Sequence, residues 1–184
     1  SIANVPAYIA GVPDSMFDWH LEEQSAPIVH IVIETTASAG ISAEFYSVRG
    51  SAVVALIDML ETAGRRCEVT LVDTMFSGWG GGHMADIRTT LKRPGDHLQL
   101  DSLAYAVCHP GYFRRIGFAH IENLPPRLAQ ALTAASYGMP SATLFERGDL
   151  YMPPVSTEDA EWANNDGARK WVVERLKEHG VVIE

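Results

Sequence analysis

The chain has 184 residues, of which 47% are hydrophobic and 20% are charged. This length is sufficient for one domain with a proper core, and the composition is that of a globular protein rather than a disordered or fibrous one. The formal net charge of −9 repels phosphate backbones, which disfavours broad nucleic-acid binding. No apolar stretch reaches the length of a membrane span, so we expect no membrane partner.

The two cysteines, Cys67 and Cys108, both lie among apolar residues. We interpret them as buried thiols in a reducing compartment rather than as a disulfide. No signal-peptide pattern opens the sequence, and together these features predict a cytoplasmic protein. The chain starts at Ser1 without a methionine, so a piece of a longer protein remains one of the alternatives.

Residues 1–26 alternate apolar side chains with turn residues. We expect a partly irregular N-terminal arm that is docked on the domain through Tyr8, Met16, Phe17 and Trp19. Residues 27–184 contain no internal repeat and no linker, which predicts a single α/β domain.

The clearest local pattern is strand, turn, helix and strand, the order of a βαβ unit. The run from Ile28 to Ile33 is apolar and typical of a central parallel strand. From Ser42 to Ala63 apolar residues recur at steps of three and four, with Ser42 as N-cap and Gly64 as the C′ residue. Gly50 lies inside this helix, and we expect it to let the helix lie close against the sheet. A second strand follows over 67–76.

A glycine-rich loop over 77–83 precedes the alternating run Ile87–Lys92. We interpret it as a hairpin connection rather than a phosphate-binding loop, because no helix follows and the Gly-Lys-Ser/Thr signature is missing. Exposed aromatic side chains on loops often contact partners. Trp79 and His83 of this loop, with Arg49 of the long helix, are therefore our candidate partner-binding residues.

The second half of the chain adds shorter elements. We expect a helix capped by Asp101 or Ser102, helices near 112–118 and over 127–137, a strand over 142–145, a helix capped by Ser156, and a last strand over 181–183. The complete order predicts an α/β fold. It would be doubly wound, with a mostly parallel sheet, one antiparallel edge hairpin, and helices on both faces.

This order of elements resembles a von Willebrand factor A-like domain. Domains of that family bind a divalent cation at the carboxyl end of the first strand, through an Asp-x-Ser-x-Ser motif. This sequence has Glu34-Thr35-Thr36-Ala37-Ser38 at that place, an acid followed by hydroxyls two and four residues on. The resemblance implies Mg²⁺ or Mn²⁺ held by Glu34, Thr36 and Ser38, with further ligands from Asp101 or Ser102 and from Glu146 or Asp149.

The leading acid of the motif is Glu34 rather than Asp, which moves the carboxylate outward by about 1 Å. Because Mg²⁺ demands near-ideal oxygen geometry, a degenerate site without metal is the alternative. In that alternative Thr36 and Ser38 serve turn formation and helix capping.

Three further segments resemble a family of phage- and prophage-encoded proteins. They are Ala7–Pro13, Arg49–Gly64 and His109–Arg115, and the resemblance spans about residues 7–124. It implies a viral or mobile-element origin and a cytoplasmic setting, and it brings no activity and no active site.

These features leave three functions open. We favour a binding module whose loops, at the carboxyl ends of the strands, dock a protein partner with or without a bridging cation. The alternative is a metal-assisted hydrolase that uses Asp73, Asp101, His83 or His109, although no H-E-x-x-H or G-x-S-x-G motif is present. The third is a structural component of a phage particle, with self-association through apolar patches of the arm and of residues 151–155.

Overall fold

The computed structural model describes residues 2–3, 9–10, 16–17, 26–76, 84–136, 140–159 and 162–181. Its strands are β1 (Ile2–Ala3), β2 (Met16–Phe17), β3 (Ile28–Glu34), β4 (Arg66–Phe76), β5 (Met84–Lys92) and β6 (Leu150–Met152). Its helices are α2 (Ala43–Thr62), α3 (Leu100–Cys108), the π-helix η1 (Tyr112–Gly117), α4 (Phe118–Glu122), α5 (Pro126–Ser136) and α6 (Asn165–Glu178).

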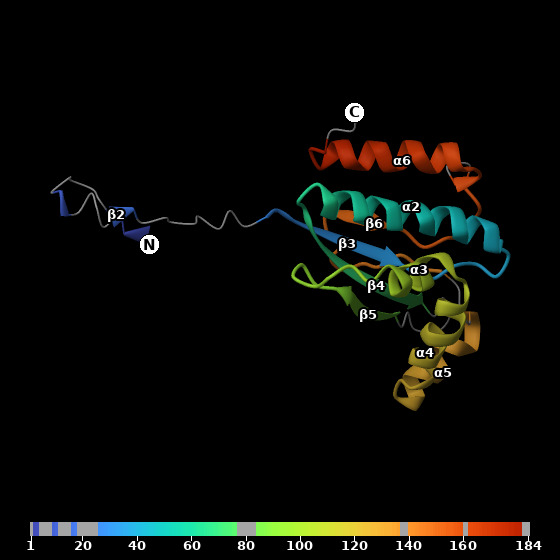
Figure 1. Ribbon diagram of the computed structural model, residues 1–184. Coiled ribbons are helices and arrows are strands. Elements are labelled where there is room, and N and C mark those ends of the chain that lie inside the picture. The colour runs from blue at the N-terminus through green and yellow to red at the C-terminus, as the bar shows by residue number, and fades with distance from the viewer. Residues whose placement is uncertain are drawn as a thin grey trace.

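Four strands form one sheet in the order β5-β4-β3-β6 (Figure 1). The central strand β3 is parallel to β4 and to β6, while β5 pairs antiparallel with β4 at the edge. This confirms the predicted α/β class, the mostly parallel order and the antiparallel edge hairpin. Strands β1 and β2 form a separate two-stranded pair.

The signals at the ends of α2 are confirmed. The side-chain oxygen of Ser42 accepts a hydrogen bond from the backbone N–H of Phe45, as an N-cap does. Gly64 has a φ of +79°, the left-handed conformation of a C′ residue. Gly50 was predicted to allow close packing against the sheet, but it faces α3. A Cβ at this position would lie 2.5 Å from the carbonyl oxygen of Val107 in α3. The close approach is therefore between α2 and α3 rather than between α2 and the sheet.

The main core lies between one face of the sheet and the helices α2, α3 and α6. The buried side chains of alternate β3 and β4 residues, Val29, Ile31, Ile33, Cys67, Val69 and Leu71, belong to the same cluster as those of these helices. A second, smaller cluster joins Met75 to Phe113, Ile121 and Leu132. Figure 1 shows α4 and α5 at the end of the sheet toward which the β3 and β4 arrows point.

The opposite face of the sheet has a different character. We expected helices on both faces. In the part of the chain that the structure describes, however, mostly polar side chains line this face. They include His30, Glu68, Thr70, Arg88 and Thr90, which border a pocket together with Glu146 and Gly148 of the 140–149 segment. The segment therefore occupies a face that α2, α3 and α6 leave uncovered.

Three local predictions are wrong, and each has a tertiary cause. Residues 142–145 form no strand, because the backbone N–H of Thr143 donates to the Glu34 side chain instead of to a neighbouring strand. The parallel strand beside β3 is β6, at residues for which the sequence predicted no strand. The last helix begins at Asn165, capped by Asn164 rather than by Ser156.

The cap of α3 is also different from the prediction, since Gln99 occupies the N-cap position and Asp101 lies in the first turn. The predicted docking of the arm through Tyr8 and Trp19, and the predicted strand 181–183 beyond Val181, lie outside the described residues. None of the helices in the described ranges combines the length and the apolar character that crossing a membrane requires.

Candidate functional site at the carboxyl ends of the strands

Glu34, the last residue of β3, has a fully buried side chain. Its Oε1 accepts hydrogen bonds from the backbone N–H of Thr143 at 2.8 Å, from the Thr74 hydroxyl at 3.0 Å and from the Tyr151 hydroxyl at 3.1 Å. Among the described residues, its Oε2 has no hydrogen-bond partner. One carboxyl oxygen is therefore saturated, and the other is buried without compensation.

Burial raises the pKa of Glu34 from 4.5 to about 7. Desolvation is the largest cause, the hydrogen bonds from Thr143, Thr74 and Tyr151 oppose it, and the nearby charge of Asp86 adds to it. A carboxyl group with this pKa changes its protonation state near neutral pH. Strongly perturbed pKa values of this kind are more frequent at functional sites than elsewhere.

The Thr74 hydroxyl lies 3.0 Å from Glu34 Oε1 and 3.0 Å from Asp86 Oδ1. A hydroxyl has one proton to donate, so it cannot donate to both carboxylates when both are ionised. When Glu34 is protonated, its O–H can donate to Thr74, and Thr74 can donate to Asp86. The geometry therefore favours one shared proton, in agreement with the raised pKa of Glu34.

Thr143 fixes the 140–149 segment to this network. Its hydroxyl donates to Asp86 Oδ2 at 2.8 Å and accepts from the backbone N–H of Phe145 at 3.0 Å. Its carbonyl oxygen accepts from the Arg147 guanidinium at 3.1 Å, and Arg88 donates to the carbonyl of Glu146 at 2.7 Å. The segment is thus held by side chains of β3 and β5 and, near its end, by the backbone hydrogen bond from Asp149 N–H to the carbonyl oxygen of His30.

The next two residues of the segment point away from this network. Leu144 is 79% exposed and Phe145 is 62% exposed, whereas Thr143 is fully buried. Phe76, which is 43% exposed, lies two residues beyond Thr74 and hence on the same face of β4. Three large apolar side chains are therefore exposed around a buried polar network that hydrogen bonds hold in place.

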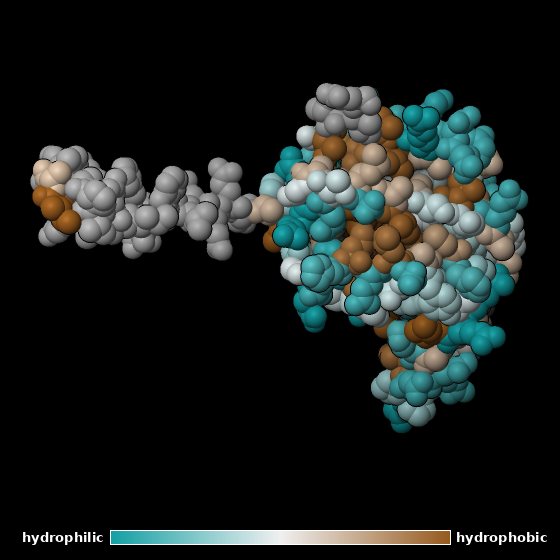
Figure 2. Space-filling view, viewed as in Figure 1, coloured by the Kyte–Doolittle hydropathy of each residue, from teal (hydrophilic) through white to brown (hydrophobic). Residues whose placement is uncertain are grey.

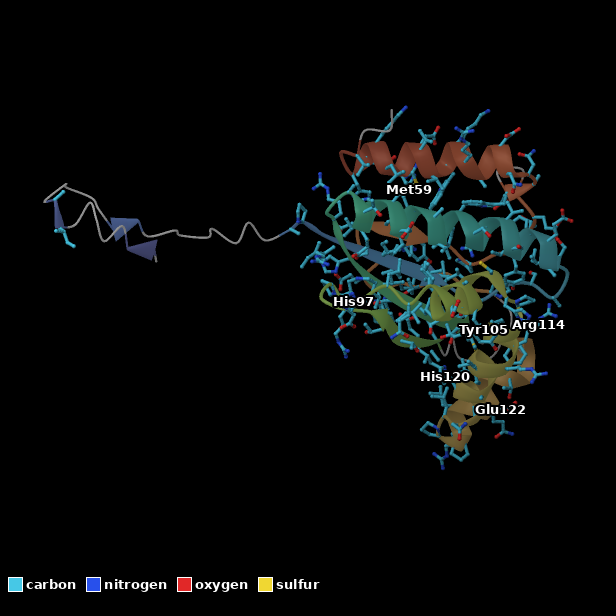
Figure 3. The ribbon with its side chains drawn as sticks, in the orientation of Figure 1. Met59, His97, Tyr105, Arg114, His120 and Glu122 are labelled. Atoms are coloured by element: carbon cyan, nitrogen blue, oxygen red, sulfur yellow. The ribbon has the colours of Figure 1, made fainter. Side chains whose placement is uncertain are left out.

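A second polar group lies on the other face of β4, under the helices. The carboxyl group of Asp73 is 2% exposed, its Oδ1 accepts from the Thr35 hydroxyl, and its Oδ2 lies 3.5 Å from Nδ1 of His120 in α4. Burial raises the pKa of Asp73, while the hydrogen bonds from Thr35 and His120 lower it. The imidazole of His120, labelled in Figure 3, is 36% exposed and so reaches solvent.

Arg49, a predicted partner-binding residue, lies inside the protein. It is 5% exposed, and its guanidinium donates to the carbonyl oxygen of Pro153 at 2.8 Å. Burial lowers its pKa to about 10, against the favourable charges of neighbouring groups that include Glu34. Arg49 therefore joins α2 to the chain after β6 and is not available at the surface.

The predicted metal ligands are only partly brought together. Glu34 and Thr36 each bury an oxygen without a partner among the described residues, and Ser38 follows two residues later. Asp149, however, accepts from the backbone N–H of His30 at 2.8 Å, about 13 Å along β3 from Glu34.

Asp101 is exposed in the first turn of α3, and within the described ranges no group of three His, Cys, Asp or Glu side chains is arranged to hold a metal ion. The network itself contains two carboxyl groups, those of Glu34 and Asp86, which lie on either side of the Thr74 hydroxyl. The implied Mg²⁺ or Mn²⁺ ion stays a prediction.

Other predicted residues lie elsewhere. Trp79 and His83 are outside the described residues. His109 is exposed, accepts from the backbone N–H of Gly111 at 2.9 Å, and stacks on Tyr105, away from Asp73. Among the described residues that we named for a hydrolase, Asp73 lies beside a histidine, which is His120.

Sequence reasoning missed Asp86, Thr143, Tyr151 and His120. None of these four residues belongs to a local sequence motif. Their partners lie far away in the sequence, up to 117 residues for Tyr151 and Glu34. A weak signal did exist for Thr143, because a polar residue precedes the apolar pair Leu144-Phe145 next to a turn.

Comparison with known protein families gives one match. The family model is described as a domain of unknown function, DUF7192, and it matches residues 1–182. The chain belongs to the DUF7192 family. Neither the curated proteins nor the solved structures include a significant match. For this DUF7192 chain, the von Willebrand factor A-like resemblance and the phage resemblance stay predictions.

Proposed function

We propose that the chain is a protein-binding module that presents Leu144 and Phe145 to an apolar pocket on its partner. The observation that carries this proposal is the change in exposure along three consecutive residues. Thr143 is fully buried and bonded through its N–H, hydroxyl and carbonyl, whereas Leu144 and Phe145 are 79% and 62% exposed.

Exposed apolar side chains on a backbone that hydrogen bonds already hold in place suit partner recognition for an energetic reason. Ordering a mobile loop on binding costs free energy, and a segment that is already bonded in place avoids most of that cost. Burying an exposed Leu or Phe side chain contributes about 1.5–3 kcal/mol each. Two such side chains on a fixed base therefore give an anchor of the type that dominates small interfaces.

The charge around the tips indicates the surface that a partner would need. The guanidinium groups of Arg88 and Arg147 are bonded within the segment, while Glu146 and Asp149 are exposed. The chain as a whole has a net charge of −9. A partner with a basic rim around an apolar pocket is complementary, and no bridging cation is needed.

A site-specific photo-crosslinking residue at position 145 tests this proposal. The protein would be added to an extract of cells that express the gene, with the same crosslinker at position 100 as the control, because Leu100 is also an exposed apolar residue (48%). We expect one partner that crosslinks at position 145 and not at 100. Excess unlabelled protein should compete for it, and the double variant Leu144→Ser/Phe145→Ser should not.

Both substituted side chains are exposed, so the double variant should unfold at the same denaturant concentration as the parent. Equal competition by the double variant, or crosslinks that are the same from both positions, would refute the proposal. Crosslinks to a second copy of the chain would assign the tips to self-association instead.

A second candidate function is proton transfer by Asp73 and His120. A buried carboxylate behind a partly exposed imidazole orients it as a general base, and such contacts are often long before substrate binds. Nitrophenyl esters of acetate and phosphate are suitable probes. Hydrolysis that falls about 100-fold in His120→Gln would support this function; equal rates for the parent and this variant would exclude it.

A further inference from the structure

An apolar groove runs along the outer surface of the molecule between α2 and α6. It has a volume of about 380 Å³, and its lining includes Val48, Ala52, Ala55 and Met59 of α2 and Val172 and Val173 of α6. Figure 2 shows apolar residues gathered over these two helices, and Figure 3 shows Met59 between them. Met59 is 38% exposed.

The N-terminal arm has the composition of a segment that needs to be covered. Residues 1–25 contain Val5, Tyr8, Ile9, Val12, Met16, Phe17 and Trp19. Ile9 is 78% exposed. The β1–β2 pair is two residues long in each strand and separate from the main sheet, and an isolated pair of strands has little stability in water.

The arm leaves the domain near the end of the groove where Met59 lies. The backbone N–H of Arg66 donates to the carbonyl oxygen of Pro27, which places the exit of the arm next to the start of β4. The neighbouring Arg65 approaches the end of α6, since a Cβ added at Gly180 would lie 3.2 Å from its guanidinium. Met59 lies in the last turn of α2 at this same end.

The lengths are also compatible. From Val48 to Met59 the groove extends about 16 Å along the helix, which five or six extended residues would fill. An arm of 25 residues reaches up to about 80 Å when extended, so it can span to another molecule and still leave residues to lie in a groove.

We propose that the groove between α2 and α6 binds the N-terminal arm of a second copy of this chain, and that two copies exchange arms reciprocally. Within one chain, the apolar arm residue Ile9 and the groove residue Met59 are exposed together. Reciprocal exchange covers both in each copy, and a two-fold arrangement closes without further addition of subunits.

Sedimentation of the full chain over a range of concentrations tests this inference. We expect a monomer–dimer equilibrium whose dissociation constant rises at least about tenfold in Ile9→Asp and in Met59→Asp. Leu100→Asp introduces the same charge at an exposed apolar position outside the groove and should leave the constant unchanged. A parent that stays monomeric, or a dimer that neither variant weakens, would overturn the inference.

A photo-crosslinker at position 9 distinguishes exchange from docking within one chain. In an equal mixture of ordinary and heavy-isotope-labelled protein, we expect half of the crosslinked products to join one chain of each kind. Their crosslinked peptides should come from α2 or α6. Products confined to a single chain, or crosslinks to other elements, would contradict arm exchange, and neither result depends on Met59→Asp folding.

Discussion

The two ends of the sheet hold acidic groups in opposite ways. At the amino end, Glu61 Oε1 lies 2.8 Å from Nζ of Lys92, which is 4% exposed and also donates to the carbonyl oxygens of Cys67 and Arg93. At the carboxyl end, one oxygen of Glu34 has hydroxyl and amide donors, and the other has none among the described residues. Burial with a cation satisfies the charge, whereas burial without one raises the pKa of Glu34.

This difference separates a complete ion pair from the network under the proposed binding site. The Lys92 ammonium and its three acceptors are complete within the fold and need no other molecule. Within the part of the chain that the structure describes, the network at Glu34 has a buried oxygen without a partner, and exposed apolar side chains lie above it. Ligands of open α/β sheets bind at the carboxyl ends of the strands, and there this protein tolerates incomplete pairing.

The largest effect is expected at the amino end. Replacement Glu61→Ala leaves the buried Lys92 ammonium without its counter-charge, and removing one partner of a buried pair costs about 3–5 kcal/mol. Urea unfolding should show this loss of unfolding free energy. The control Glu178→Ala breaks the exposed pair with Arg175 and should cost less than about 1 kcal/mol. Equal losses in the two variants would remove the distinction between the two ends of the sheet.

The next effect is a pH dependence at the carboxyl end. The folded-state pKa of Glu34, about 7, lies above its unfolded value of 4.5, so the folded chain binds more protons between these values. Its stability therefore falls as the pH rises from 4.5 to about 7 and is constant above that range. The full loss corresponds to up to about 3 kcal/mol.

The variant Glu34→Gln removes this dependence. Its unfolding free energy relative to the parent should rise by up to about 3 kcal/mol between pH 4.5 and pH values above 7. Denaturant unfolding at several pH values measures this difference. A difference in unfolding free energy that is the same at every pH does not affect the result, because the prediction concerns only how that difference changes with pH. A difference that does not change with pH would show that Glu34 is ionised normally.

The smallest effect concerns packing between α2 and α3. A Cβ at Gly50 would lie 2.6 Å from Cys108 Sγ and 2.5 Å from the Val107 carbonyl oxygen, so Gly50→Ala forces α3 outward. Overpacking of this kind costs about 1–3 kcal/mol, of which the better helix propensity of Ala returns up to about 1. The control Gly40→Ala meets no atom within 4 Å and should change the thermal midpoint little. A stabilised Gly50→Ala would disprove the close contact.

Much of the fold follows from local sequence signals. The apolar run of β3, the spacing within α2 and its limits at Ser42 and Gly64 depend on neighbouring residues alone, and the structure confirms them. The candidate site is different. Glu34 was predicted as a metal ligand from the von Willebrand factor A-like resemblance, yet its environment depends on residues that no local pattern connects to it.

The sequence by itself determined a βαβ unit with an antiparallel edge, because side-chain periodicity, capping and turn chemistry act over a few residues. Tertiary structure alone decided that 142–145 is not a strand, that Arg49 is buried, and that Glu34 has a pKa near 7. The reason is distance along the chain. Thr143 meets Glu34 across 109 residues, and hydrogen bonding, desolvation and exposure depend on which distant atoms the fold brings together.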